Sequence, residues 1–487
     1  MSSLRRSFLI LSVLTWLSFA CCFPNQRCAA EELVSKAEAQ KALQQAVEFF
    51  RENCSAGGGY IFRVSVDLTK REGEGVVGKT TAWLEPPATP AVGMAYLEAY
   101  QLSGDELCLK AAIETAEALL QGQLESGGWY HKIEFDPNDR QRYAFRVEKD
   151  SAARRANTTT FDDDKSQSAA RFLMQLDREL KFKTERLHEA TLFALNCFVK
   201  SQYPNGAWPQ RYSEFPQAKD FLVKAASFPK QWSRQYKGED YKKHYTLNDD
   251  TISDLIVTML DAYEVYGDEK FQESAKRGGD FLILAQLPQP QPGWAQQYNK
   301  EMHPAWARKF EPAAITGGES QGVMRTLLHL YRRTGDRKYL EPIPRALAYY
   351  RSVQLSDNKM ARFYEIRTNR PLYFTKDYKL TYSDADMPTH YGFKVGHNLD
   401  RIQRDLSEIE RIPKNELWKP RTVEAPRSSR GLQRRATELV RSLDKRGAWV
   451  EDGSMKYHEN DDTKRIIQSS TFAKNLVALA SFIGSKD

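Results

Sequence analysis

Two short acidic runs in this sequence carry side chains that could bind a metal ion. The first, Thr158–Gln167 (TTTFDDDKSQ), places three aspartates in succession just before an amphipathic helix pattern. One aspartate at a helix start caps free N–H groups and interacts favourably with the helix dipole, but three adjacent like charges repel one another. Calcium prefers six to eight oxygen ligands, commonly carboxylates, and would remove that repulsion. For this run alone, helix capping is the favoured interpretation and metal binding is the alternative.

A second run, Asn248-Asp249-Asp250, repeats the arrangement at the start of a later helix pattern. Two such runs at equivalent places favour metal binding over capping. Glu319 precedes a third helix of the same kind, where it could add a carboxylate, although capping of its own helix is favoured. The eight histidines are scattered, so the sequence does not predict a zinc site of His and Cys ligands.

One arginine stands out in the segment Pro304–Ser320 (PAWARKFEPAAITGGES). Arg308 lies between Trp306 and Phe310, and the segment then runs through Gly317-Gly318 into a helix pattern. Either this arginine has a chemical role in an aromatic frame, or the segment is an ordinary loop-to-helix junction with one solvated arginine. The segment alone does not separate the two.

The charge of the chain limits its partners. The formal net charge is +7, and it is near +4 without the first 30 residues, which carry three arginines and no acid. This mild excess permits an acidic substrate, and it is too weak to indicate a nucleic-acid partner. After residue 30 only three cysteines remain, Cys54, Cys108 and Cys197. An odd count predicts buried free thiols rather than a disulfide framework.

The first 30 residues have the pattern of a secretory signal peptide. Arg5 and Arg6 precede the apolar run Phe8–Phe23, and Cys28-Ala29-Ala30 offers a cleavage site of small residues. We therefore expect a secreted or periplasmic protein; lipid attachment at Cys21 is the weaker alternative. No later stretch has the ~20 apolar residues that a membrane span needs.

Helix pairs recur along the chain. Gly-Asp pairs separate two helical patterns at Gly104-Asp105, Gly267-Asp268 and Gly335-Asp336, where glycine suits a helix C-terminus and aspartate suits the next N-cap. A glutamine follows each aspartate by eighteen residues, and Thr184 is followed in the same way by Gln202. The other three glutamines are Gln123, Gln286 and Gln354. Three of the four glutamines lead into a glycine-aromatic loop: Gly128-Trp129, Gly206-Ala207-Trp208 or Gly293-Trp294.

The repeat predicts that Glu106–Gln123, Glu269–Gln286 and Arg337–Gln354 are each the second helix of a hairpin. Helix pairs that each bury one face can close into an α/α toroid, an all-α fold, although periodicity alone also allows an open array. In a toroid the acidic helix starts lie on one rim, so we expect them to converge around one mouth. The predicted domains are a signal peptide (1–30), the toroid (31–394), and a charged extension with a final helix (395–487).

Several motifs in chain order resemble those of the family-10 polysaccharide lyases, the pectate lyases. They are Thr160-Phe161-Asp162-Asp163, Asn205-Gly206-Ala207-Trp208-Pro209-Gln210, Asn248-Asp249-Asp250, Ala307-Arg308-Lys309-Phe310-Glu311-Pro312 with Gly318-Glu319-Ser320, and Arg362-Phe363-Tyr364-Glu365. The matching part of the chain runs from about Glu85 to Phe374. Four or five motifs in the family's order make the resemblance specific, and it supports the α/α-toroid fold.

The resemblance implies roles for individual residues. Asp162, Asp163 and Asp249 are the expected calcium and active-centre acids, and Arg308 is the expected catalytic base. The implied partner is an acidic polysaccharide, polygalacturonate, acted on by a protein that we expect to be monomeric. The residues expected to bind substrate are Arg362, Arg370, Lys376 and Trp306. For the two arginines, a salt bridge to nearby acids is the alternative.

Two departures from the family pattern concern the substrate. Residues Asp386–Lys394 (DMPTHYGFK) lack the arginine that the family carries there, so Lys376, Lys394 or another cation would have to replace it. Residues 135–160 form an unusual insertion, which is either a solvated loop or a basic wall beside the acidic mouth.

Together these features predict a secreted calcium-dependent pectate lyase that cleaves α-1,4-linked galacturonan by β-elimination. An arginine base is chemically awkward because its pKa exceeds ~12, and we expect burial beside calcium and other cations to favour its neutral form. Two alternatives stay open. One is an α/α-toroid glycoside hydrolase acting on uronic-acid glycans, which needs two carboxylic acids instead. The other is a non-catalytic calcium-dependent pectin-binding protein.

Overall fold

The computed structural model describes residues 32–148, 155–238, 240–420 and 422–486. The predicted signal peptide and the alternative lipid attachment at Cys21 lie outside these residues. None of the helices in the described ranges combines the length and the apolar character needed to cross a membrane. The three cysteines of the described chain are buried free thiols, as predicted.

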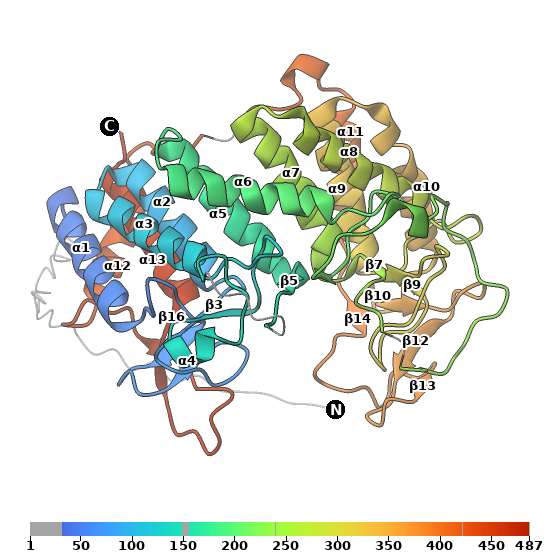
Figure 1. Cartoon of the computed structure of the whole chain (residues 1–487), viewed down its shortest axis with the longest axis horizontal. Coiled ribbons are helices and arrows are strands. Elements are labelled where there is room, and N and C mark those ends of the chain that lie inside the picture. Colours follow the sequence, from blue (N-terminus) through green and yellow to red (C-terminus); the bar gives the residue numbers. More distant parts are fainter. Residues whose placement is uncertain (1–31, 149–154, 239, 421, 487) are drawn as a thin grey trace, which may run out of the picture.

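Most of the regular structure is helical and is built from antiparallel hairpins (Figure 1). Each hairpin has a leading helix and a return helix. The leading helices are α2 (Thr89–Ser103), α5 (Lys165–Glu179), α7 (Thr251–Tyr266) and α9 (Glu319–Thr334), and the return helices are α3 (Glu106–Gln121), α6 (Glu185–Lys200), α8 (Glu269–Leu284) and α10 (Pro342–Ser352). The remaining helices are α1 (Lys36–Asn53), the single turn α4 (Pro137–Arg140), α11 (Leu399–Ile409), α12 (Arg430–Ser442) and α13 (Ser469–Ile483).

The helices pack in two series. One series runs α13, α2, α5, α7, α9, α11, each helix against the next, and the return helices α3, α6 and α8 pack in the same order beside it. The last helix, α13, packs on α1 and α2, so the end of the chain joins its beginning. This is the predicted all-α toroid of helix hairpins. Because α12 and α13 share the main core with α1 and α2, residues 395–487 add to that core; the domain boundary at residue 394 stays a prediction.

The Gly-Asp turns have the predicted geometry. Gly104, Gly267 and Gly335 adopt left-handed backbone with φ of 72°, 70° and 69°, which glycine reaches at no steric cost. The following aspartates accept hydrogen bonds from the N–H groups two residues on, so each caps the next helix. Each of the three predicted return segments is helical. The third differs slightly, because a 3₁₀ turn (Arg337–Tyr339) precedes α10.

The eighteen-residue spacing has a physical cause. The Gln123 amide donates to the carbonyl of Gly127 in its own loop and to that of Ala190 on the next return helix, at 3.0 and 2.9 Å. Gln202 makes the equivalent pair of bonds to Gly206 and Ser274 at 2.9 and 3.0 Å. Gln286 repeats the arrangement with Pro292 and Pro342. Each buried amide therefore fixes how one hairpin sits against the next.

The tryptophans of the glycine-aromatic loops form a second repeated contact. Trp129, Trp208 and Trp294 are completely buried, and each indole N–H donates to a main-chain carbonyl near the end of the preceding helix, at 2.8 to 2.9 Å. Trp208 therefore packs in the core, as predicted, and does not present its ring to solvent. Trp449 makes the same contact with Leu439.

Short strands in the connecting loops carry the leading-helix starts. β5 (Thr159–Thr160) pairs with β6 (Arg211–Tyr212), β7 (Tyr245–Thr246) with β8 (Gln297–Tyr298), and β9 (Ile315–Thr316) with β11 (Phe363–Tyr364). β9 ends three residues before α9, whereas β5 and β7 each end two residues before a 3₁₀ turn that leads into α5 or α7. The other strands are β1 (Arg63–Ser65), β2 (Arg71–Glu72), β3 (Thr81–Trp83), β4 (Lys132–Glu134), β10 (Met360–Ala361), β12 (Pro371–Phe374), β13 (Leu380–Thr381), β14 (Lys394–Val395), β15 (Glu451–Asp452) and β16 (Arg465–Gln468).

The glutamine bridges can be tested by truncation. Gln202→Ala leaves the buried carbonyls of Gly206 and Ser274 without their donor, so we expect the free energy of unfolding to fall by about 1–3 kcal/mol. Gln354→Ala is the matched control, because Gln354 bonds His397 instead of two main-chain carbonyls and should change stability by less than about 0.5 kcal/mol. Urea-induced unfolding measures both. Equal losses in the two variants would contradict the proposed role.

Candidate active site

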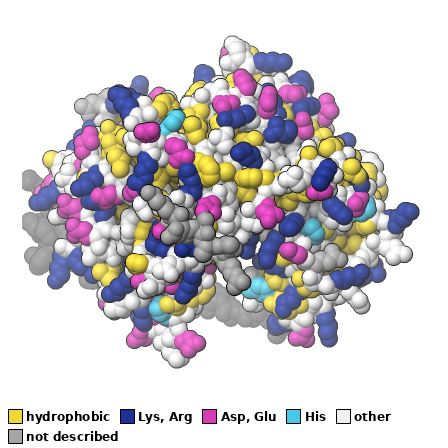
Figure 2. Space-filling model, in the orientation of Figure 1, with side chains coloured by type: hydrophobic (Ala, Val, Ile, Leu, Met, Phe, Trp, Pro, Cys, Tyr) yellow, Lys and Arg dark blue, Asp and Glu magenta, His cyan; other side chains and the backbone are white. Residues whose placement is uncertain are grey.

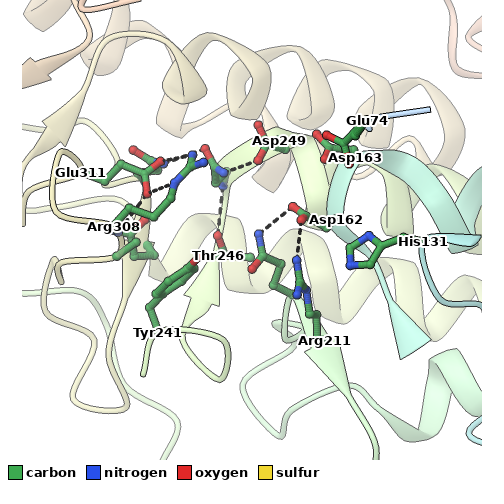
Figure 3. Close-up of a pocket in the computed structure, with 15 residues that line it drawn as sticks. Glu74, His131, Asp162, Asp163, Arg211, Tyr241, Thr246, Asp249, Arg308 and Glu311 are labelled. Carbon is green, nitrogen blue, oxygen red and sulfur yellow. Dashed lines mark hydrogen bonds and ion pairs between the residues drawn. The ribbon is translucent and has the colours of Figure 1, made fainter. Parts of the chain in front are cut away.

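The two acidic runs meet. The one-turn 3₁₀ helices η1 (Asp162–Asp164) and η3 (Asn248–Asp250) precede α5 and α7 and contact each other. Asp162, Asp163 and Asp249 each offer one carboxylate oxygen within 4.8 Å of the other two (Figure 3). The predicted convergence of these two helix starts is therefore confirmed.

Matching backbone geometry positions the two runs. Asp163 and Asp249 both lie in the left-handed region, at φ of 49° and 50°, and so do the aspartates that follow them. Aspartate tolerates this region better than most residues, yet such a conformation costs of order 1–3 kcal/mol and persists where the surroundings enforce it. Thr160 and Thr246 help to enforce it, because each hydroxyl accepts from the main-chain N–H two residues on at 3.2 Å.

The three carboxylates repel one another. Desolvation by the surrounding protein, followed by the like charges of Asp163 and Asp162, raises the pKa of Asp249 to about 7, even though the residue keeps an exposed edge. A bound cation would remove this repulsion, and a set of carboxylate oxygens is what calcium prefers. The residues present therefore fit a calcium ion.

Cationic and amide side chains surround the acids. Asp162 accepts from the Gln210 amide at 2.7 Å and from the Arg211 guanidinium at 3.0 Å. The ammonium of Lys165 is completely buried and lies 2.9 Å from both Asp163 and Glu85. Burial raises the pKa of Glu85 to about 7, against the opposing effect of Lys165.

Arg308 lies across the cavity from this cluster and is paired with Glu311. Its guanidinium donates to both carboxylate oxygens of Glu311, at 2.7 and 2.5 Å, and its main-chain N–H donates to one of them at 3.0 Å. Glu311 is almost fully buried and also accepts from Gln296 and from the Tyr391 hydroxyl. The hydrogen bonds that Arg308 donates to Glu311 outweigh desolvation and raise the pKa of Arg308. The protein side chains alone therefore favour protonated Arg308, and the expectation that burial beside calcium and other cations favours its neutral form stays a prediction.

These groups line one cavity of about 400 Å³ (Figure 3). The carboxylate cluster forms one wall and the Arg308–Glu311 pair forms the other. The lining residues are Glu74, His131, Asp162, Asp163, Gln210, Arg211, Tyr241, Thr246, Asn248, Asp249, Gln296, Gln297, Ala307, Arg308 and Glu311. Burial and the neighbouring Lys165 and Arg211 lower the pKa of His131 to about 4, so this imidazole is neutral at pH 7.

Comparison with known proteins gives the family. The family model described as "Pectic acid lyase" matches residues 123–361, which include the carboxylate cluster and Arg308. This region belongs to the pectic acid lyase family. The resemblance drawn from the motifs is thereby confirmed. No curated protein sequence matches the chain.

Several solved structures resemble the chain at low sequence identity. A family-10 polysaccharide lyase from Cellvibrio cellulosa, a mutant with one aspartate replaced by alanine and in complex with "trigalaturonic acid", is 18% identical, with a TM-score of 0.46 over 66% of this chain and 98% of that one. A second structure of a family-10 lyase from that organism gives 19% identity and a TM-score of 0.44, over 65% and 97%. A GH76 α-mannanase from Bacteroides thetaiotaomicron is 10% identical, with a TM-score of 0.40 over 92% and 95%.

Within the pectic acid lyase region and just beyond it, the structure separates the residues expected to bind substrate. Arg362 lies near the active-site cavity, where it is 2.9 Å from Glu319 and stacks on Tyr391 at 4.6 Å. Trp306 lies on the far side of the Arg308 segment and packs edge-on against Phe374, so it does not frame Arg308 as Phe310 does.

Two further residues that were expected to bind substrate lie outside the active-site cavity. Arg370 stacks on Tyr382 at 3.3 Å on the β11–β12 hairpin. Lys376 is largely exposed, 3.5 Å from Asp386. Lys394, which could have replaced the missing family arginine, is paired with Asp384 and Asp357 at 2.5 and 3.2 Å. Their roles toward substrate stay predictions.

Sequence reasoning missed four residues of this candidate site. Arg211 and Gln210 follow the Asn-Gly-Ala-Trp-Pro motif, and the register of β5 and β6 places Arg211 opposite Thr160, two residues before Asp162. Glu311 stands three residues after Arg308, a spacing that could have indicated the pair. Tyr391 comes from the divergent segment 386–394 and has no local signal.

The buried lysine can be tested through stability. Lys165→Met leaves Asp163 and Glu85 close together without their shared cation, so the free energy of unfolding should fall by about 2–3 kcal/mol. The measurement is urea unfolding in the presence of a chelator. Adding Glu85→Gln to Lys165→Met removes one of the two charges and should restore part of the loss. If Lys165→Met alone is as stable as the wild type, Lys165 is not the counter-ion of these two carboxylates.

Proposed function

We propose that this protein is a secreted, calcium-dependent pectate lyase that cleaves α-1,4-linked galacturonan by β-elimination. One observation carries the proposal: the three clustered carboxylates and the paired arginine of a pectic acid lyase motif face each other across one cavity. Secretion rests on the predicted signal peptide, and we expect the protein to act as a monomer.

The reaction removes a poorly acidic proton. The C5 proton of a galacturonate residue is α to its carboxylate, and its removal develops enolate-like charge on that group. Calcium held by Asp162, Asp163 and Asp249 would supply positive charge at the substrate carboxylate. Arg211 lies at the same wall, bonded to Asp162, and Arg362 lies beside Tyr391 at the Arg308 side, so both are placed to bind uronate carboxylates.

Arg308 is the proposed base. It takes the C5 proton, the electron pair forms the C4–C5 double bond, and the 4-linked oxygen leaves. Glu311 fixes the guanidinium plane by its two hydrogen bonds, which orients the arginine but also stabilises its protonated form. Only the small neutral fraction is competent, so the reaction is expected to favour alkaline conditions.

The metal role predicts a chelation effect. Wild-type protein with polygalacturonate and calcium should generate the ultraviolet absorbance of the unsaturated product, and excess chelator should abolish it. Asp249→Ala and Asp162→Ala should weaken calcium binding, measured by calorimetry, at least roughly tenfold, because each removes one ligand. Asp462→Ala is the control, since this side chain is 96% exposed and remote from the cluster in sequence. Full activity in excess chelator would rule out the metal.

The proton-transfer role predicts a pH profile and a mutant series. Because Glu311 raises the pKa of Arg308, the neutral fraction grows across the whole alkaline range, and the rate should rise close to tenfold per pH unit while the protein stays folded. Arg308→Ala should lower kcat by ~10²–10⁴ with little change in KM. Arg308→Lys keeps a cation but loses the planar guanidinium group, so it should restore little of the lost kcat. Arg401→Ala, at a largely exposed arginine, is the control.

The product separates this proposal from the two alternatives. A flat pH profile, active Arg308→Ala protein and a saturated reducing end would identify a glycoside hydrolase that uses two carboxylic acids. Binding of polygalacturonate by wild-type protein without any turnover would identify a non-catalytic binding protein.

A further inference from the structure

A second cavity, of about 490 Å³, lies beside the active-site cavity. The segment that carries Arg308 separates the two, because Ala307 and Arg308 line the first cavity while Trp306 and Lys309 line the second. Its other walls come from residues 234–236 and from the hairpin of β12 and β13. We call it the cationic cleft, defined by Arg234, Tyr236, Trp306, Lys309, Lys379 and Tyr382.

The charge of the cationic cleft is opposite to that of its neighbour. Among the described residues that line it, three are cationic and none is acidic, whereas five carboxylates line the active-site cavity. Neither Lys309 nor Lys379 has a carboxylate within ion-pair distance in the described part of the chain, while Arg234 is held by Glu365 at 2.5 Å. Figure 2 shows several Lys and Arg side chains over this part of the molecule, at the lower right. An anion here would bind without a metal.

Aromatic rings accompany these cations. Tyr236 and Trp306 lie 5.9 Å apart between ring centres, and Tyr236 is 41% exposed. The Lys309 ammonium lies 3.6 Å from the ring centre of Tyr378, a contact that positions its charge. A ligand with an apolar ring face and a carboxylate matches exposed rings next to ammonium groups.

The cleft is held in place before any ligand binds. The Trp306 indole donates to the Ser233 carbonyl at 2.9 Å, and the Trp232 indole donates to the carbonyl of Ala313. Glu365, nearly fully buried, accepts from Arg234 and from the Tyr382 hydroxyl, and so ties residues 234–236 to the β13 side. The walls of the cleft therefore keep their positions without a ligand, which lowers the conformational cost of binding.

We infer that the cationic cleft binds a galacturonate residue of the polymer away from the bond that is cleaved, through direct contacts of Lys309 and Lys379 with its carboxylate. The ligand class rests on the proposed function, because the cleft adjoins the proposed catalytic arginine along the same chain segment. The two cavities then hold uronates in different ways. The active-site cavity needs a cation between carboxylates, whereas the cationic cleft does not.

The test measures binding without turnover. Hexagalacturonate is titrated into the full chain by calorimetry in excess chelator, where calcium-dependent binding and cleavage are absent. The wild type should bind, and Lys309→Gln with Lys379→Gln should weaken binding about tenfold or more. Tyr236→Ala, which removes a ring and no charge, should also weaken it. A methyl-esterified hexamer should bind the wild type about tenfold more weakly than the acid.

Lys300→Gln is the matched control, because Lys300 is exposed after β8 and lines neither cavity. It should bind as the wild type does. The proposal is overturned if the wild type does not bind in chelator, if the double lysine variant keeps full affinity, or if Lys300→Gln loses as much. Failure of the lyase proposal shows instead as missing unsaturated product with calcium, and it leaves this binding result unchanged.

Discussion

The buried glutamine amides between consecutive hairpins are the contact on which the site depends. Gln123, Gln202 and Gln286 each bond one carbonyl of their own loop and one of the next return helix, so each hairpin has a fixed height and rotation relative to its neighbour. A single carboxylate cluster needs two separate helix starts, at Asp162 and Asp249, to meet within a few ångströms. Hydrophobic packing alone tolerates sliding of one helix along another. Directional bonds between buried groups do not, because a slipped amide would leave two carbonyls unsatisfied.

The fixed positions of the hairpins also bring the negative charges of Asp162, Asp163 and Asp249 together, and the surrounding cationic side chains neutralise them only in part. Lys165 and Arg211 neutralise Asp163 and Asp162, but Asp249 has no cationic side chain within ion-pair distance in the described chain, and its pKa is raised to about 7. The left-handed backbone at Asp163 and Asp249 adds strain at the same place. Strain and repulsion that the fold maintains at one point are typical of a site completed by a ligand rather than of a structural element.

Much of this arrangement could be predicted from the sequence, because it rests on local signals. The Gly-Asp turns, the glutamine spacing and the acidic runs each mark a helix end, and a regular repeat implies that equivalent ends share one rim. The contacts that individual side chains make in space could not be predicted in this way. Trp306 flanks Arg308 in sequence, but adjacent residues point in different directions, and its ring packs on the Phe374 side. Lys394 was a candidate to replace the missing arginine, yet it pairs with two aspartates.

The Arg308–Glu311 pair shows why an arginine base needs its neighbours to be neutralised. Three groups raise the pKa of Arg308: Glu311, which contacts it directly, then Tyr391, and then Asp249, whose negative charge acts across the cavity. Glu311 is buried, and breaking its contact with Arg308 would leave a buried charge without its cation, so its contribution persists. The contribution of Asp249 is different, because a cation bound at the cluster would neutralise it and would itself act on Arg308 with the opposite sign. Cation binding at the carboxylates and proton loss from the arginine are thus coupled through the field in the cavity, without any movement of the chain. In the proposed reaction, the geometry that brings Asp249 opposite Arg308 would therefore link metal binding to activation of the base, and the glutamine bridges hold that geometry.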